Sequence, residues 1–208
     1  YSSSGSNTQY QRIDYFNFLD SDPGQTTDWQ TFFGYTVKGG VNFNLDDHNN
    51  IFANVGYFSK APIFDNVFYF NNNLIDNAEN EEILGAELGY GFATPVVAFN
   101  INGFFTKWSN RAISVQYTYT DTAGISTDYQ ANIAGAEQQH VGVEFEGKWQ
   151  PLRFLEFGGM FSWSDNKFQN DVSAILYPEE DPSQIKEVNS YVNGLYVSDF
   201  PMTTASMN

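Results

Sequence analysis

Residues 138–149 read Gln-Gln-His-Val-Gly-Val-Glu-Phe-Glu-Gly-Lys-Trp, and this stretch decides the fold class. Its even positions carry Gln, His, Gly, Glu, Glu and Lys, whereas its odd positions carry Gln, Val, Val, Phe, Gly and Trp. Successive side chains of a β-strand point to opposite faces of the sheet, so this alternation gives one polar and one apolar face. The stretch therefore predicts a strand that separates an aqueous side from an apolar side.

The same alternation recurs along most of the chain, between segments rich in turn-forming residues. We expect strands over residues 9–19, 35–45, 51–60, 82–92, 96–106, 138–149 and 154–165, with a further strand opening at 206–208. Short turns fall at 46–50, 93–95 and 150–153, and long polar connections fall at 20–34, 61–81, 107–137 and 166–200.

Short turns at one end, long loops at the other and strands of roughly ten residues are typical of outer-membrane barrels. We therefore predict an all-β, antiparallel transmembrane β-barrel. An odd and unfinished set of strands does not close in lipid, so the chain is expected to be part of a larger barrel.

Composition narrows the function classes. The 208 residues include 25 Asp and Glu but only 9 Lys and Arg, a net charge of -16, which disfavours nucleic acid as a partner. Aromatic residues make up 18% of the chain, which argues against an acidic disordered segment. Cysteine is absent, so disulfide scaffolds and Cys-zinc sites are excluded. No apolar run reaches the roughly 18 residues of a transmembrane helix.

Motifs for catalysis, metal binding or a cofactor are missing, and we expect no enzyme activity. His48 falls in a turn, and the calcium-like opening at residues 20–24 lacks its later ligands, although a calcium ion among the acidic external loops stays open. Glu144 and Glu146 share the polar face and resemble a carboxylate pair for glycoside hydrolysis. The preferred interpretation is that they are solvated or ion-paired carboxylates of a lumen.

Several motifs in fixed order resemble TonB-dependent outer-membrane receptors, in particular their SusC-like branch. They are the strand Tyr35–Leu45 with the following Gly56–Pro62, an E-x-x-x-x-E-x-G pattern at Glu82, Glu87 and Gly89, and an N-x-x-G…G-V-E-x-E pattern at Asn132, Gly135 and Gly142–Glu146. The resemblance covers residues 8–205. It implies a barrel of about 22 strands with an N-terminal plug, which uses TonB to import a large ligand such as a glycan or a peptide.

The resemblance also sets the expected partners and location. Residues 1–208 would form part of the C-terminal half of one barrel domain, and no plug sequence is evident in them. The expected partners are the rest of the barrel and the plug, TonB through segments outside this stretch, a SusD-like surface lipoprotein and the lipid of the bacterial outer membrane. No nucleic acid is expected.

Two sets of residues are candidates for a functional site. Polar side chains on the wet face of the strands are expected to line the lumen: Lys38, Asn42, Asn54, Glu87, Asn100, Asn102, His140, Glu144, Glu146 and Lys148. Aromatic residues of the expected external loops either stack on a sugar or peptide ligand or pack loop on loop: Phe64, Phe68, Tyr69, Trp108, Tyr117 and Tyr119.

Other functions stay open at this point. One is a small self-contained outer-membrane barrel with an adhesin or structural role. Another is a secreted β-sandwich that binds carbohydrate, which would pair its apolar faces into one core. A soluble glycosidase ranks below both. For an importer, a glycan, peptide, siderophore or vitamin would each suit loops rich in aromatic residues and asparagine.

Overall fold

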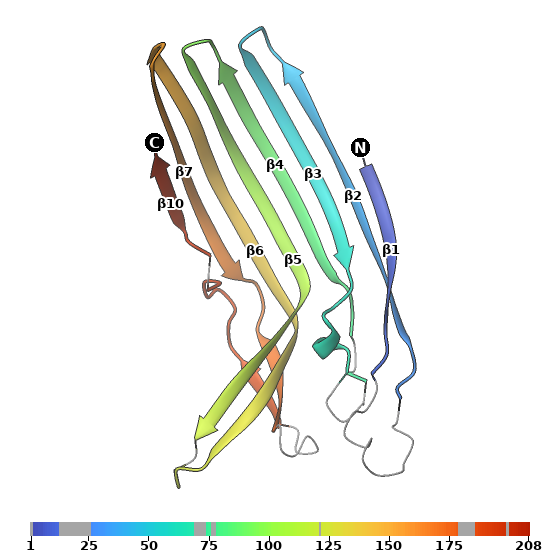
Figure 1. The fold of residues 1–208 in the computed structure, drawn as a ribbon. Helices are drawn as coiled ribbons and strands as arrows, with labels where there is room; N and C mark the ends of the chain where they lie inside the picture. The colour runs from blue at the N-terminus through green and yellow to red at the C-terminus, as the bar shows by residue number, and fades with distance from the viewer. Residues whose placement is uncertain are drawn as a thin grey trace.

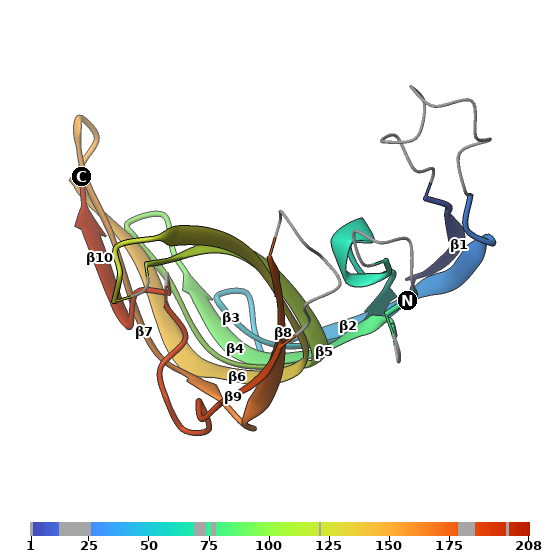
Figure 2. The same cartoon turned by 90° about the horizontal axis from the view of Figure 1, so that it is seen from below.

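The computed structural model is a single antiparallel sheet that curves into part of a barrel wall (Figures 1 and 2). It describes residues 2–12, 26–68, 74–75, 78–120, 122–178, 186–198 and 200–208. The elements are β1 (Ser2–Tyr10), β2 (Gln30–Asn44), β3 (Asn49–Lys60), the 3-10 helix η2 (Phe64–Asn66), β4 (Glu81–Ala93), β5 (Val97–Thr120), β6 (Ser126–Leu152), β7 (Leu155–Phe168), β8 (Val172–Pro178), β9 (Lys186–Ser190) and β10 (Thr203–Met207).

Strands β1 to β7 pair in chain order, and β10 pairs with the free edge of β7. Strand β8 pairs with residues 129–133 of β6 on one side and with β9 on the other. Within the described part of the chain, β1 and β10 end the sheet without pairing to one another. The prediction of an all-β antiparallel fold is confirmed, and the sheet is open.

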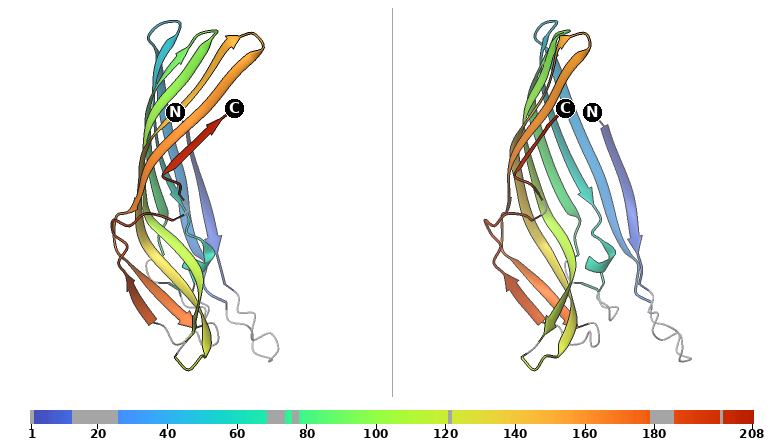
Figure 3. Two further views of the ribbon diagram at one scale, coloured as in Figure 1. Left: turned by 90° about the vertical axis from the view of Figure 1, so that its left-hand side faces the viewer. Right: turned by 60° about the vertical axis from the view of Figure 1, so that its left-hand side comes forward.

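Three tight turns lie together at one end of the sheet, and the β5–β6 hairpin projects at the other end (Figures 1 and 3). The β2–β3 turn is held by Asp46, whose carboxylate accepts the backbone N–H groups of His48 at 2.8 Å and Asn49 at 2.9 Å. The bond from His48, followed by that from the Asn49 side chain, lowers the pKa of Asp46 below its ordinary value. This asparagine-rich turn thus has a local reason for its shape.

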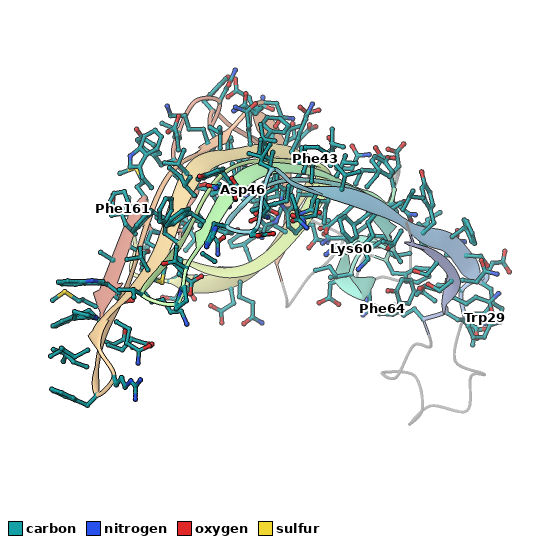
Figure 4. All side chains as sticks on the ribbon, turned by 90° about the horizontal axis from the view of Figure 1, so that it is seen from above. Trp29, Phe43, Asp46, Lys60, Phe64 and Phe161 are labelled. Atoms are coloured by element: carbon teal, nitrogen blue, oxygen red, sulfur yellow. The ribbon has the colours of Figure 1, made fainter. Side chains whose placement is uncertain are left out.

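The two faces of the sheet differ in polarity along its whole width. Phe43 and Phe161 project from the convex side, whereas Lys60 and Phe64 lie on the concave side (Figure 4). Convex side chains are highly exposed, for example Val41 at 70% and Leu88 at 63%. Soluble proteins rarely expose an apolar patch of this extent.

No second sheet covers this apolar face among the described residues, so the structure does not support the β-sandwich alternative. A charged row borders the apolar band on the side of the β5–β6 hairpin. It contains two ion pairs, Lys107–Glu137 at 3.0 Å and Asp165–Lys167 at 2.9 Å. An outward-facing apolar band opposite a polar face is the pattern of a sheet that spans a bilayer.

The prediction of a long loop at 107–137 is wrong, because most of this stretch is strand. Strands β5 and β6 continue through it as one hairpin, with Ile113 opposite Ile133 and Thr120 opposite Ser126. The register shifts on both sides of Arg111, and Asn110 takes a positive φ of 54°. These bulges interrupt the alternation, which is why the pattern does not read as one continuous strand.

Two further expectations differ from the structure. The first strand was expected at 9–19, whereas β1 spans Ser2–Tyr10 and residues 13–19 lie outside the described part. The expected loop at 166–200 contains β8 and β9. Among the described residues, no helix is long and apolar enough to cross a membrane.

The packed core lies at the hairpin end rather than in the curved wall. Val67 and Phe68 follow η2 and are buried against β5 and β6, together with Ala131 and Ala136 of β6. The Asn132 amide donates to the Asp65 carbonyl at 2.6 Å and ties the η2 segment to β6. A one-layer wall has no interior of its own, so burial concentrates where loops stack on strands.

Candidate functional site

The concave face carries every residue that was expected to line a lumen. Strand register places all ten on this face: Lys38, Asn42, Asn54, Glu87, Asn100, Asn102, His140, Glu144, Glu146 and Lys148. Neighbouring amides and carboxylates pair across strands. The Asn54 amide donates to Glu87 at 3.0 Å, and the Asn102 amide donates to Glu144 at 3.3 Å. These hydrogen bonds fix the orientation of the Glu87 and Glu144 carboxylates on the surface of the concave face.

Phenylalanine rings on the concave face lie flat over glycines. A Cβ atom added to Gly89 would come within 2.1 Å of the Phe52 ring, and one added to Gly142 within 2.7 Å of the Phe104 ring. The rings occupy the volume that larger residues would fill. The polar face is thus a smooth surface of rings, backbone and paired polar groups.

A groove of about 680 Å³ crosses this surface over β2 to β6. Phe58 and Phe104 contribute its aromatic walls, and Lys38, Asn54 and Glu87 contribute its polar groups. A second hollow of about 580 Å³ lies nearer the tight turns and is lined by Asn50, Asn100, Glu146 and Lys148, among others. Both are open hollows on one wall.

Trp108 does not lie in an external loop. It belongs to β5, with the Lys60 ammonium 5.6 Å and the Arg111 guanidinium 5.0 Å from its ring centroid. Lys60 lies 2.5 Å from the buried carboxylate of Glu81, whose other oxygen accepts the backbone N–H of Ala112 at 3.0 Å. Trp108 is therefore in cation–π contact with two side chains of the protein itself.

His140 is set apart from the other nine polar residues predicted for the lumen by its burial. It is only 6% exposed, its Nδ1 lies 2.9 Å from the Asn166 amide oxygen, and Phe200 lies 4.8 Å away ring to ring. The Asn166 amide donates onward to the Ser164 hydroxyl at 2.8 Å. Within the described residues no group of three or more His, Cys, Asp or Glu side chains could hold a metal ion.

The remaining aromatic candidates divide between packing and exposure. Phe68 is 1% exposed and packs 5.4 Å from Phe64, which is the loop-packing alternative. Tyr119 is 48% exposed near the tip of the β5–β6 hairpin. Tyr117 lies in β5 opposite Tyr129, but its side chain is outside the described part, as is the whole of Tyr69.

Comparison with protein families gives the decisive match. A family model described as TonB dependent receptor-like, beta-barrel matches residues 8–207. The chain belongs to the TonB-dependent receptor-like β-barrel family. Comparisons with curated proteins and with solved structures gave no match.

Membership has direct consequences for this TonB-dependent receptor barrel. The family is one of transporters rather than enzymes, which agrees with the sequence expectation of no catalysis. It implies the bacterial outer membrane, a plug domain and interaction with TonB. The sheet of this family member is apolar over its convex face and polar over its concave face.

Sequence reasoning missed three features of this receptor wall. The engaged Trp108, the buried Glu81 and the cover that Phe200 forms over His140 all depend on contacts between distant segments. One signal was available: residues 113–120 alternate Ile, Ser, Val, Gln, Tyr, Thr, Tyr, Thr, which is a strand pattern. The glycines on the polar positions of β3, β4 and β6 were a second signal of close ring packing.

Proposed function

We propose that this chain forms part of the wall of a SusC-like, TonB-dependent importer that takes up a large nutrient such as a glycan or a peptide. The observation that carries the proposal is the single open sheet, apolar over its convex face and polar over its concave face, in a chain matched from 8 to 207 by the receptor barrel family. Residues 1–208 contribute strands of the C-terminal half of a barrel of about 22 strands. The remaining strands and the plug domain complete the lumen.

In this arrangement the three tight turns face the periplasm and the β5–β6 hairpin faces the cell exterior, as in other outer-membrane barrels. The hairpin and the adjoining β8 and β9 extend the wall beyond the membrane, where a SusD-like surface lipoprotein would cover the mouth. Tyr119, which is exposed, and Phe64, which is half-buried, are the described aromatic candidates that a ligand or this lipoprotein would meet. TonB engages through segments outside residues 1–208.

Import by this mechanism needs energy from TonB, so the first test compares uptake in cells with and without functional TonB. We expect labelled oligosaccharide or peptide nutrient to enter only when both the receptor and TonB are present. Uptake that continues at the same rate without TonB would contradict the proposed function.

Membrane orientation has its own test, because the sequence contains no native cysteine. Thr122→Cys at the hairpin tip should react with a membrane-impermeant thiol reagent on intact cells. Asp47→Cys in the β2–β3 turn should react only after the outer membrane is permeabilised. The reverse pattern would show that the assigned orientation is wrong.

A further inference from the structure

We propose that the hollow around Gly85 on the concave face is a binding subsite for one pyranose ring of a neutral oligosaccharide. We call it the Gly85 pit and define it by Gly85, Lys38, Asn54, Phe58, Glu87 and Phe104, which line the larger groove. This inference rests on the proposed function, because it names a substrate class for the importer and a place where that substrate contacts the wall.

Neither the backbone conformation at Gly85 nor the packing of the described residues around it requires glycine. Its φ is not in the left-handed region, unlike that of Gly124, Gly135 and Gly194. A Cβ added to it would meet only the Thr106 hydroxyl, at 4.0 Å. Glycine weakens a strand interior, and it is kept where a ligand or another backbone approaches closely. Among the described residues no side chain fills the space over Gly85, and we assign this space to a ligand.

Other glycines on this face show the contrast. The rings of Phe52 and Phe104 fill the space over Gly89 and Gly142, and the Phe58 ring lies 2.9 Å from a Cβ built on Gly56. Gly56 pairs directly with Gly85 in the register. Gly85 is therefore an open glycine on a face where Gly56, Gly89 and Gly142 are covered by rings, and the Phe58 ring lies beside it over Gly56.

The pit offers the two kinds of contact that a sugar ring uses. Phe58 and Phe104 present apolar ring surface to the C–H face of a pyranose, and the oriented Asn54–Glu87 pair presents an amide and a carboxylate to its hydroxyl groups. The groove volume of about 680 Å³ accommodates such a ring with its neighbours along a chain.

Charge and backbone pairing argue against other ligands. Lys38, Glu87 and Glu144 line the same groove, so two carboxylates disfavour an anion and the Lys38 ammonium disfavours a cation beside it. The backbone groups of β3, β4 and β5 are already paired in continuous ladders, which leaves no strand edge in the pit for a peptide to join. A neutral, hydroxyl-bearing ring meets all of these conditions.

The test uses the full receptor in outer-membrane vesicles, with Gly85→Cys labelled by a neutral, water-soluble thiol reagent. Asn44→Cys is the matched control, because it lies exposed on the same face about 20 Å further along β2 from the level of the pit. The probes are short neutral oligosaccharides of glucose, mannose and galactose, and a neutral peptide of similar size. At a probe concentration ten times its Kd, labelling of Gly85→Cys should slow about elevenfold, since only free sites react.

Each outcome decides the question. Protection of Gly85→Cys by an oligosaccharide, with Asn44→Cys unchanged, supports the pit. Full reactivity at Gly85→Cys while calorimetry shows the oligosaccharide bound overturns it, and so does protection by the peptide alone. A Gly85→Cys that fails to react without any probe also overturns it, because another part of the protein then fills the pit.

A second pair of variants tests transport. Gly85→Leu fills the pit, whereas Gly39→Leu adds the same side chain to the convex face, where nothing lies within 4 Å of a new Cβ. We expect oligosaccharide affinity to fall about tenfold or more in the first variant only. Equal affinity in both would refute the pit, while TonB-dependent uptake by the wild type would leave the proposed function standing. Absence of any TonB-dependent uptake would refute both.

Discussion

Leu88→Arg tests the assignment of the convex face to lipid. The strand register gives the depth of Leu88 in the bilayer, and this depth sets the expected loss of stability. Leu88 is 63% exposed on that face. It lies four residues from Leu84, which pairs with Lys107 at the charged border, and six residues from Thr94 in the β4–β5 turn. At about 3.3 Å per residue these spans are about 13 Å and 20 Å. A strand tilt of about 45° reduces them to about 9 Å and 14 Å along the membrane normal.

The two heights together are close to the roughly 25 Å apolar band of an outer-membrane barrel, so Leu88 sits near the bilayer midplane. Arginine at that depth costs about 2–4 kcal/mol. Glu87→Arg is the matched control, since it introduces the same side chain one residue away on the concave face. It removes one hydrogen bond from Asn54, worth about 0.5–1.5 kcal/mol.

The assay is denaturant unfolding of the full receptor reconstituted in lipid vesicles and followed by tryptophan fluorescence. We expect the unfolding midpoint of Leu88→Arg to fall well below those of the wild type and of Glu87→Arg. Equal midpoints for the two variants, or a lower midpoint for Glu87→Arg, would refute the assignment of the two faces.

Three further predictions concern the wall and its turns. Gly142→Ala should lower the free energy of unfolding by about 1–3 kcal/mol, because the new Cβ would lie 2.4 Å from the Trp163 carbonyl oxygen. Gly85→Ala should be neutral or stabilise by up to about 1 kcal/mol. The unfolding midpoints of the two variants check this, and a lower midpoint for Gly85→Ala would contradict it. Glu81→Ala leaves the partly buried backbone N–H of Ala112 without its acceptor and should cost about 1–3 kcal/mol in the same assay. An unchanged midpoint would show that this carboxylate does not brace β5. The folded-state pKa of Asp46 is lowered, so its stabilising effect on the turn should be complete above the ordinary value of 3.8 and disappear as pH falls through the folded pKa. The stability difference between wild type and Asp46→Ala should therefore shrink at strongly acidic pH, and a difference that grows there would be inconsistent with this sign.

Sequence reasoning succeeded where the signal was local. The strands predicted at 35–45, 51–60 and 82–92 agree with β2, β3 and β4 within about five residues, and the start predicted at 96 agrees with that of β5. Each of these segments has uninterrupted alternation and a turn rich in Asp, Asn or Pro beside it. The prediction failed at 107–137, where Asn110 and Gly135 adopt positive φ angles and the β5–β6 register shifts on both sides of Arg111. Bulges change the face on which each side chain lies, and a strict two-residue period cannot follow them.

The candidate site shows the same division. Alternation alone assigned the ten polar residues from Lys38 to Lys148 to one face, and the register of the sheet places them there. It assigned Trp108 to an external loop, but Trp108 belongs to β5 and packs against Lys60 and Arg111. For Phe68 it left ligand contact and loop packing open, and the burial of this ring beside η2 is loop packing. Such contacts join residues far apart in the chain, so no local pattern contains them.

By itself, the sequence determined an antiparallel sheet with one wet and one apolar face, the places of its tight turns and the absence of cysteine chemistry. These properties follow from side-chain period and from turn residues, which act over a few positions. Only the tertiary structure decided which glycines of the concave face are covered by rings and that Gly85 on this face is open. It also decided that His140 is buried beside Phe200 and that Glu81 is enclosed beside Lys60. Those features depend on how strands align side by side and how loops return over them, and this alignment is set by packing across the whole sheet.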